Sequence, residues 1–308
     1  SQIYQVAVDV PLITAGCSRW RFDENTGMTA ADDSGNGRDG TLTNMDPGAW
    51  VTGLKGSALE FDGLDDYVDI SGYKGIPGGR SRSCAAWIKT NHLGTIMSWG
   101  NASDGEKWMF MVHTWTMGEP GVLRVGVWGG GEVMGSTPVT DGQWHHVAAV
   151  LASDGSPDVS EVKLYVDGQL ETISSSTAQP INTVSGTDVT IGTIDATYGY
   201  YFNGLIDEAR IWGYALTESQ IYEVAVDVPL RWTFDEGTGT SAEEISGSGK
   251  DGTLINMDPS AWVGGKIGAA LDFDGVNDYV EIAGYKGVTG KQPRTVAAWI
   301  KTNHLGTI

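Results

Sequence analysis

The segment that decides the fold is DGQWHHVAAVLASDGSPDVSEVKLYVDGQLETI, at 141–173. Within it, the runs at 143–151 and 161–166 have the length and the residue types of β-strands. The second run leads into Asp167-Gly168, a strong signal for a two-residue hairpin turn, and then into a further strand at 169–173. The segment therefore predicts consecutive antiparallel strands with tight turns.

The same pattern extends over the rest of the chain. Glycine accounts for 44 of the 308 residues, and short strand-like runs alternate with Gly, Asp and Asn. Two of these runs, at 107–114 and 121–128, are close enough to form a hairpin. Further runs lie at 58–70, 188–192 and 204–212. Many short strands without a long amphipathic helix predict an all-β sandwich or jelly roll.

The chain also repeats itself over the length of a domain. SQIYQVAVDVPL at 1–12 returns at 219–230 with 11 of 12 residues identical, and 19–96 returns at 231–308 with 51 of 78 identical. A period this long indicates tandem domains rather than solenoid turns. The sequence therefore predicts a linker at 1–17, a complete domain at 18–217, a short helix and linker at 218–229, and the N-terminal part of a second domain at 230–308.

The helix is predicted by a capping box. Thr217 and Gln220 have the spacing at which each side chain bonds the backbone N–H of the other residue. We expect the helix to run to about residue 224 and a short linker to follow it, which would leave neighbouring domains little freedom.

Charge and hydropathy exclude two classes of partner. The formal net charge is −20 and the sequence pI is about 4.4, so the chain should repel nucleic acid and anionic lipid. No apolar stretch approaches the 18 residues of a membrane span, so membrane insertion is not expected. An acidic surface suits calcium and an extracellular setting.

The two cysteines occur only in the first copy of the repeat. Cys17 lies in a segment at 13–18 that the second copy lacks, and Cys84 stands where the second copy has Val296. Their joint occurrence favours a disulfide, which would imply an oxidising compartment. The alternative is two free thiols.

Seven segments in order resemble the laminin-G-like, concanavalin A-like jelly-roll domains of secreted proteins. They are WRFDENTG (20–27), DSGNGRDGTL (33–42), FDGLDDYVDI (61–70), CAAWIKT (84–90), DGQWHHVAAV (141–150), VKLYVDGQ (162–169) and FNGLIDEARIWGYAL (202–216). The resemblance implies two antiparallel sheets packed face to face in a jelly-roll sandwich. It does not fix function, since this fold carries lectins, enzymes and inert spacers.

The resemblance also implies a structural calcium site. Its ligands would be Asp23 or Glu24, carbonyls of the loop at 35–37 that includes Gly37, and Asp207. Carboxylate and carbonyl oxygens are the ligands that calcium prefers. Asp33 becomes Ile245 in the second copy, which argues against Asp33 as an essential ligand. The alternative for the loop is that its polar residues only shape a turn.

Exposed aromatic side chains would make the sugar site of such a fold. The candidates are Trp108, Trp115, Tyr198 and Tyr200. If Trp108 faces the core, alternation places Phe110 and Val112 with it and sends His113 to the other face. The alternative is that most of these rings fill the core. Trp115 and Tyr198 lie in predicted turns, so we expect them to be exposed.

The sequence contains no recognisable set of catalytic residues. Asp207 and Glu208 are adjacent, so on a strand they would point to opposite faces and could not act as an acid/base pair. No Cys, Asp or Glu lies at metal-ligand spacing from His145 and His146, so both histidines are interpreted as structural. No nucleophile elbow of the G-x-S-x-G form occurs. The sequence therefore predicts a protein that is not an enzyme.

The leading hypothesis is a structural and adhesive tandem-repeat domain of a large secreted or cell-surface protein. Its partners would be neighbouring copies of the same domain, and glycans or surface proteins bound through avidity. The main alternative is a lectin-type module with a defined sugar site, and a glycan-degrading enzyme ranks third. Convergence of Trp115 and Tyr198 beside an acidic residue would favour the lectin.

Overall fold

The computed structural model describes residues 16–116, 118–225, 232–244, 250–283, 285, 296 and 298–302. The chain divides into two compact units, Ser1–Asp227 and Val228–Ile308. Most of the predicted linker at 1–17 and the residues 226–229 of the second linker lie outside the described residues.

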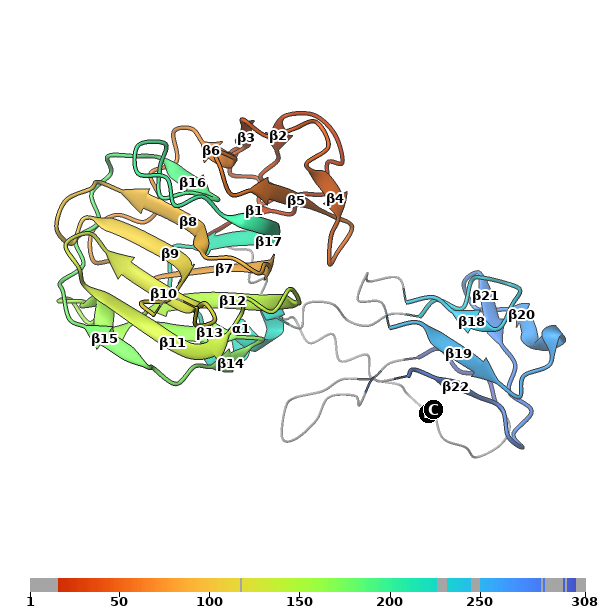
Figure 1. Ribbon diagram of the computed structural model, residues 1–308. Helices are drawn as coiled ribbons and strands as arrows, with labels where there is room; N and C mark the ends of the chain where they lie inside the picture. The colour runs from red at the N-terminus through yellow and green to blue at the C-terminus, as the bar shows by residue number, and fades with distance from the viewer. Residues whose placement is uncertain are drawn as a thin grey trace. The chain divides into compact units, whose positions relative to one another are not determined.

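The first unit is a sandwich of two antiparallel sheets (Figure 1). The eight-stranded sheet has the order β14-β13-β12-β7-β17-β5-β4, and β1 also pairs with β17. Its strands are β1 (Cys17–Trp20), β4 (Trp50–Thr52), β5 (Ser57–Asp62), β7 (Arg82–Lys89), β12 (Trp144–Leu151), β13 (Lys163–Val166), β14 (Gln169–Leu170) and β17 (Asn203–Trp212). A 3-10 turn, η1 (Val159–Glu161), precedes β13.

The nine-stranded sheet has the order β15-β11-β10-β9-β8-β16-β6-β3-β2. Its strands are β2 (Thr29–Ala30), β3 (Gly40–Thr43), β6 (Tyr67–Ile70), β8 (Gly94–Gly100), β9 (Lys107–His113), β10 (Val122–Val127), β11 (Glu132–Pro138), β15 (Ser175–Thr177) and β16 (Val189–Ile191). The predicted all-β jelly-roll sandwich is confirmed.

The hairpins predicted from the turn residues are present. β12, β13 and β14 pair in succession, and β10 pairs with β9 along the whole length of β10. Asp167 and Gly168 have φ angles of 50° and 75°, the left-handed values that a two-residue hairpin turn requires at both positions. The Asp-Gly pair therefore sets the register of β13 against β14.

The core between the sheets contains large aromatic side chains and one buried cation. Trp99 and Trp108 stack with ring centroids 5.8 Å apart, and both are fully buried. The Arg82 guanidinium lies over the Trp108 ring at 5.1 Å, and it donates to Thr183 Oγ1 at 2.9 Å and to the Gly78 carbonyl. These bonds satisfy the buried guanidinium and tie two loops to the core.

The predicted helix is confirmed as α1 (Glu218–Ala225). Gln220 Oε1 accepts from the Thr217 N–H at 2.9 Å, and Thr217 Oγ1 accepts from the Gln220 N–H at 3.3 Å, which is the predicted capping box. Ile221 and Val224 pack with Trp212 in a cluster on the outer face of the eight-stranded sheet. The helix therefore covers part of that face.

The predicted disulfide between Cys17 and Cys84 is wrong. Both cysteines are free and buried, and burial raises the pKa of each thiol to about 12. Cys17 pairs with Trp212 on one side of β17, and Cys84 pairs with Ile211 on the other side. Two strand spacings, roughly 10 Å, separate them, and their side chains enter clusters on opposite faces of the sheet.

The second unit repeats the first strands of the first unit. Its three-stranded sheet contains β18 (Ser241–Ala242), β19 (Gly252–Ile255) and β22 (Tyr279–Glu281), and a second sheet pairs β20 (Trp262–Gly264) with β21 (Ala269–Leu271), after the 3-10 turn η2 (Pro259–Ala261). Trp232 donates to the Lys250 carbonyl at 2.9 Å, as Trp20 does to the Arg38 carbonyl at 2.8 Å. The two copies therefore share hydrogen bonds as well as sequence.

Equivalent apolar side chains differ in exposure between the units. Phe61 is 1% exposed whereas its equivalent Phe273 is 48% exposed, and Ile88 is 0% exposed whereas Ile300 is 59% exposed. In the first unit the strand β17 pairs with both β5 and β7, which carry Phe61 and Ile88. The contacts that bury these positions therefore come from strands late in the domain.

Candidate ligand-binding face

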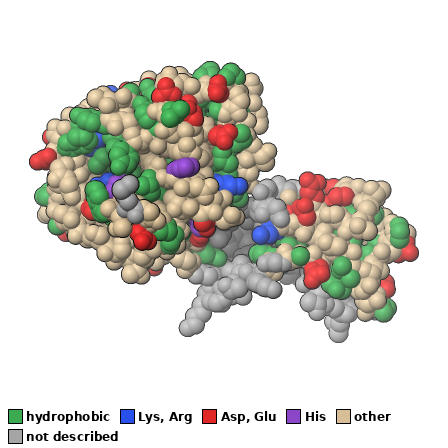
Figure 2. All heavy atoms as spheres, in the orientation of Figure 1, with side chains coloured by type: hydrophobic (Ala, Val, Ile, Leu, Met, Phe, Trp, Pro, Cys, Tyr) green, Lys and Arg blue, Asp and Glu red, His purple; other side chains and the backbone are tan. Residues whose placement is uncertain are grey.

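The outer face of the nine-stranded sheet carries the exposed aromatic side chains. Along β9 the alternation is as expected, since Trp108, Phe110 and Val112 belong to the core between the sheets. The outward positions are Met109, Met111 and His113. Met109 and Met111 cluster with Ile194 and with the partly buried Trp128. Figure 2 shows hydrophobic side chains gathered on this side of the domain, with a histidine and a basic side chain among them.

Trp108 does not belong to this face. Its side chain is 0% exposed and stacks on Trp99 inside the sandwich. The prediction that Trp108 binds a ligand is therefore wrong, because a ring with no accessible surface cannot contact one. The alternative reading of this residue, that it fills the core, describes it correctly.

Trp115 is exposed and held in place. It lies in the turn after β9 and is 65% exposed. Its indole N–H donates to Glu132 Oε1 at 2.8 Å, and Arg124 Nε donates to Glu132 Oε2 at 2.6 Å. The Arg124 guanidinium also lies 5.2 Å from the centre of the indole ring. The ring is thus fixed by a buried ion pair while most of its surface faces solvent.

His113 and Tyr200 extend the aromatic surface from Trp115. The His113 ring lies 4.5 Å from the Trp115 ring and 6.0 Å from the Tyr200 ring. Burial, and then the charge of Arg124, lowers the pKa of His113, so the imidazole is neutral at physiological pH. Tyr200 is 51% exposed and has a φ of 61°, a strained conformation for a tyrosine.

Tyr198 and Trp128 form a second aromatic pair on the same face. Their ring centroids are 4.6 Å apart, and Tyr198 is 49% exposed. The loop that carries Tyr198 is held at its base by Asp195, which accepts from the fully buried Lys107 Nζ at 2.6 Å. Asp195 Oδ1 also accepts from the N–H groups of Thr197 and Tyr198. The segment 194–201, called the tyrosine loop below, is therefore anchored to β9.

A shallow cleft of about 380 Å³ adjoins Trp115. It lies between the turn after β7 and the turn after β9, and its lining includes Asn91, Leu93, Trp115, Glu119 and Thr140. One exposed indole thus borders both the aromatic face and a cleft lined by polar and apolar side chains.

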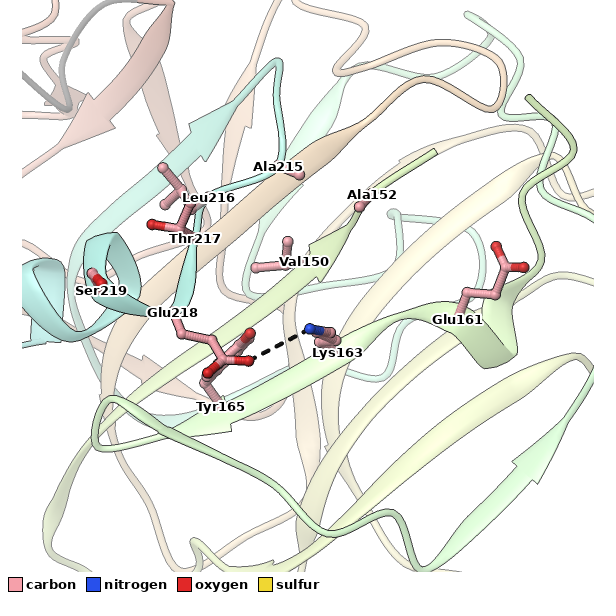
Figure 3. Close-up of a pocket in the computed structure, with 10 residues that line it drawn as sticks. All are labelled: Val150, Ala152, Glu161, Lys163, Tyr165, Ala215, Leu216, Thr217, Glu218 and Ser219. Atoms are coloured by element: carbon pink, nitrogen blue, oxygen red, sulfur yellow. Dashed lines mark hydrogen bonds and ion pairs between the residues drawn. The ribbon is translucent and has the colours of Figure 1, made fainter. Parts of the chain in front are cut away.

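A second cavity, of about 410 Å³, lies where α1 begins (Figure 3). Val150 and Tyr165 line it, and Lys163 and Glu218 point toward each other across it at 3.5 Å. Both members of this ion pair are more than half exposed. These contacts join the start of the helix to β13, and we assign this cavity a packing role.

Asp207 is the best placed of the predicted calcium ligands. Its Oδ2 accepts from the N–H groups of Leu54 and Lys55, each at 3.0 Å, whereas its Oδ1 is buried without a partner. Burial raises the pKa of Asp207 to about 7, and the charges of Glu208 and Asp23 add to this effect. A buried carboxylate with one unsatisfied oxygen beside a second carboxylate fits a hard cation.

Asp23 lies at the same turn as Asp207 but already has a structural role. Its Oδ1 accepts from the Ser57 N–H at 3.0 Å. In the second unit Asp235 makes the same bond to the Ala269 N–H at 2.8 Å. The two copies therefore use this carboxylate in the same way.

Glu24 and Gly37 are positioned differently. Glu24 Oε1 accepts from the Ala31 N–H at 2.9 Å, whereas its Oε2 is buried without a partner, as is Oε2 of the equivalent Glu236. The loop at 35–37 is held near the start of β1, since the Asn36 amide donates to the Cys17 carbonyl at 2.6 Å. Asp207 and Asp23 share the turn at 54–57, and the described contacts do not bring Gly37 to it. If calcium binds, Asp207 and Asp23 would hold it.

A group of three acidic side chains lies in the turn after β5. Carboxylate oxygens of Asp62, Asp65 and Asp66 lie within 4.8 Å of one another. Burial raises the pKa of Asp66. The second copy has Asn277 in place of Asp65, so the group is not shared by the two copies.

Replacing Asp207 with asparagine should change how stability depends on pH. The folded-state pKa of about 7 lies above the ordinary value of 3.8, so this group's contribution is greatest below pH 3.8 and is lost as the pH rises through 7. The variant should therefore gain stability relative to the wild type as the pH rises from 4 to 8, as measured by urea unfolding. Parallel pH profiles for the two proteins would refute this assignment.

The same pair of proteins tests the metal. If Asp207 and Asp23 hold calcium, then calcium raises the melting temperature of the wild type and chelator reverses the rise. The Asp207→Asn variant should respond to neither. An equal response of both proteins would place any bound calcium elsewhere.

The fold and this face define a jelly-roll domain of two antiparallel sheets with aromatic side chains on one outer surface. The chain belongs to the concanavalin A-like lectin/glucanases superfamily, since residues 61–222 match its Laminin_G_3 family. The resemblance drawn from the seven segments is thus confirmed. No match to a curated protein sequence was found.

Several solved structures are similar over part of the chain. Domain 4 of AbnA, a GH43 extracellular arabinanase from Geobacillus stearothermophilus in complex with arabinotriose, is 24% identical with a TM-score of 0.49, over 68% of this chain and 97% of that one. The binding domain of Paraclostridial Mosquitocidal Protein 1 is 13% identical with a TM-score of 0.49, over 82% of this chain and 60% of that one. A heptameric SAP-like pentraxin from Limulus polyphemus is 19% identical with a TM-score of 0.35, over 49% and 71%.

Among the described residues, no helix has the length and apolar character needed to cross a lipid bilayer.

The residues that sequence reasoning missed are the charged partners of the aromatic rings. They are Lys107, Arg124, Glu132 and Asp195. One signal was present in the sequence. Lys107 and Arg124 interrupt otherwise apolar strands, and such a charge requires a partner when it is buried.

Proposed function

We propose that the first unit is a non-catalytic adhesive module that binds carbohydrate through the outer face of its nine-stranded sheet. The observation that carries this proposal is the exposed indole of Trp115, fixed by Glu132 and continued by the rings of His113 and Tyr200. Large apolar rings exposed together on a folded domain mark interaction sites. Rings held rigidly before binding lose little entropy when a ligand stacks on them.

The arrangement of the acidic side chains supports a role without catalysis. Glu208 accepts from Arg19 and Arg210. On the aromatic face, Glu132 and Asp195 are engaged by Arg124 and Lys107. Carboxylates used in this way as structural acceptors are poor candidates for an acid/base pair.

The second candidate function is a structural spacer in an array of like domains. It is favoured by the internal repeat, in which 51 of 78 residues recur, and by the short connection between copies. The two functions are compatible, because an array multiplies weak contacts with a surface glycan. We place the array outside the cell, with neighbouring copies as partners.

Glycan-array binding by the 308-residue chain tests the proposal. We expect binding to a defined sugar chain, and Trp115→Ala and Tyr198→Ala should each weaken it by about 30-fold, the loss typical of an interface hot spot. Leu170→Ala is the matched control, since this exposed apolar side chain lies on the other sheet.

Three results would contradict the proposal. One is the absence of binding to every glycan by a protein shown to be folded. Another is binding that survives both aromatic substitutions. The third is an equal loss in the Leu170→Ala control.

A further inference from the structure

The cations of the aromatic face are already neutralised. Lys107 and Arg124 are the only Lys or Arg residues in the strands of the nine-stranded sheet. Lys107 is 0% exposed and contacts Asp195 at 2.6 Å, and Arg124 is 8% exposed and contacts Glu132 at 2.6 Å. Neither cation is available to a negatively charged ligand.

The turns that border the face carry acids and no Lys or Arg. This holds for 101–106, 114–121 and 194–201, and the turn at 128–131 carries no charged residue. Asp104 and Glu119 are exposed in two of these turns. His113 adds no charge at physiological pH, since its pKa is lowered. An anionic sugar would therefore meet repulsion, and its charged group would lose water without gaining a partner.

The aromatic pairs lie toward opposite ends of one strand. Trp115 follows His113 at the end of β9, and Trp128 follows Val127, which pairs with Trp108 near the start of β9. The rise per residue places these two ends roughly 17 Å apart. Between them Met109 and Met111 are buried and cluster with Ile194 of the tyrosine loop. The tyrosine loop runs between the two ends, since Tyr200 contacts His113 and Tyr198 contacts Trp128. A ligand that stacks on both Trp115 and Trp128 must therefore be an extended chain.

We infer that the ligand class of this face is an extended, uncharged oligosaccharide, and that anionic glycans are excluded. This inference rests on the proposed function and narrows it. Stacking on neutral rings requires sugar faces rather than charged groups, and the buried ion pairs act only to position those rings. Specificity thus arises from the absence of a free cation as much as from the aromatic surface.

Isothermal titration of the full chain with matched oligosaccharides tests the inference. The probes are neutral oligosaccharides of increasing length built from one backbone, and the longest of them with uronic acid side groups. We expect affinity to rise with length until both aromatic pairs are engaged. The carboxylated form should bind at least ten-fold more weakly at low salt, and the gap should narrow as salt rises.

A charge-reversal variant provides a gain-of-function control. Glu119→Lys places a cation in the turn beside Trp115, so it should raise the affinity for the carboxylated chain relative to the neutral chain by several-fold. Because a ratio within one protein is measured, a modest change in folding stability does not affect the comparison. An unchanged ratio at low salt would count against the electrostatic part of the inference.

The outcomes separate the inference from the proposed function. Equal or tighter binding of the carboxylated chain would overturn the inference while leaving carbohydrate binding intact. Equal affinity for the shortest and longest neutral chains would overturn the inference that the ligand is an extended chain. If no oligosaccharide binds, the proposed function fails and the inference fails with it.

Discussion

Replacement of Trp108 by alanine should destabilise the first unit by about 4 kcal/mol, whereas Trp115→Ala should change stability by less than about 0.5 kcal/mol. Trp108 is fully buried, stacks on Trp99 and lies under the Arg82 guanidinium. Its removal would leave a large cavity and take away the ring that Arg82 covers. Trp115 is 65% exposed, so its removal costs little packing.

Urea unfolding of both variants measures this contrast. If Trp108→Ala does not fold, Trp108→Phe provides the test, since it keeps a ring in the stack and should lose less stability. The two tryptophans should also differ in function, because only Trp115→Ala should reduce glycan binding in a folded protein. Equal stability losses for Trp108→Ala and Trp115→Ala would contradict the assignment of one ring to the core and the other to the surface.

Substitution of Asp195 by asparagine should cost about 3 kcal/mol or more, because it leaves the Lys107 ammonium buried without a counter-charge. Lys107 Nζ contacts Asp195 Oδ2 at 2.6 Å and the Gly100 carbonyl at 3.1 Å. Burial opposes ionisation of Asp195, but Lys107 and the N–H groups of the tyrosine loop hold its pKa below the ordinary value. Asp195 is therefore ionised at physiological pH.

A double variant distinguishes the cost of an unpaired buried charge from the cost of losing the anchor of the tyrosine loop. Lys107→Met with Asp195→Asn should recover much of the stability, since no uncompensated charge remains. The matched control is Lys163→Met, which removes one partner of an exposed pair and should change stability by less than 1 kcal/mol. If Asp195→Asn were as harmless as Lys163→Met, the buried pair would not be stabilising the domain.

The strands and turns of this protein could be predicted because they depend on local patterns. Alternation along 107–114 placed Trp108 and His113 on opposite faces, and Asp167-Gly168 specified its hairpin. The capping box at Thr217 fixed the start of α1. In each case residues close in sequence contain the whole of the information.

The errors and omissions concern contacts between residues far apart in sequence. Alternation states which side chains share a face but not which face is buried, and so Trp108 remained a candidate for the surface. Cys17 and Cys84 occur together in one copy, yet β17 runs between them. The pair of Lys107 and Asp195 spans 88 residues, and only the packing of the tyrosine loop on β9 brings these charges together.

The anchoring of the tyrosine loop separates the residues that hold it from those that face outward. Asp195 secures the loop through its own side chain and through the backbone N–H groups of Thr197 and Tyr198, which any residue other than proline supplies at those positions. The side chains at 196, 197 and 198 are therefore open to diversification without loss of the anchor. A combinatorial library at these positions would turn the domain into a scaffold whose recognition can be reprogrammed while its framework is preserved.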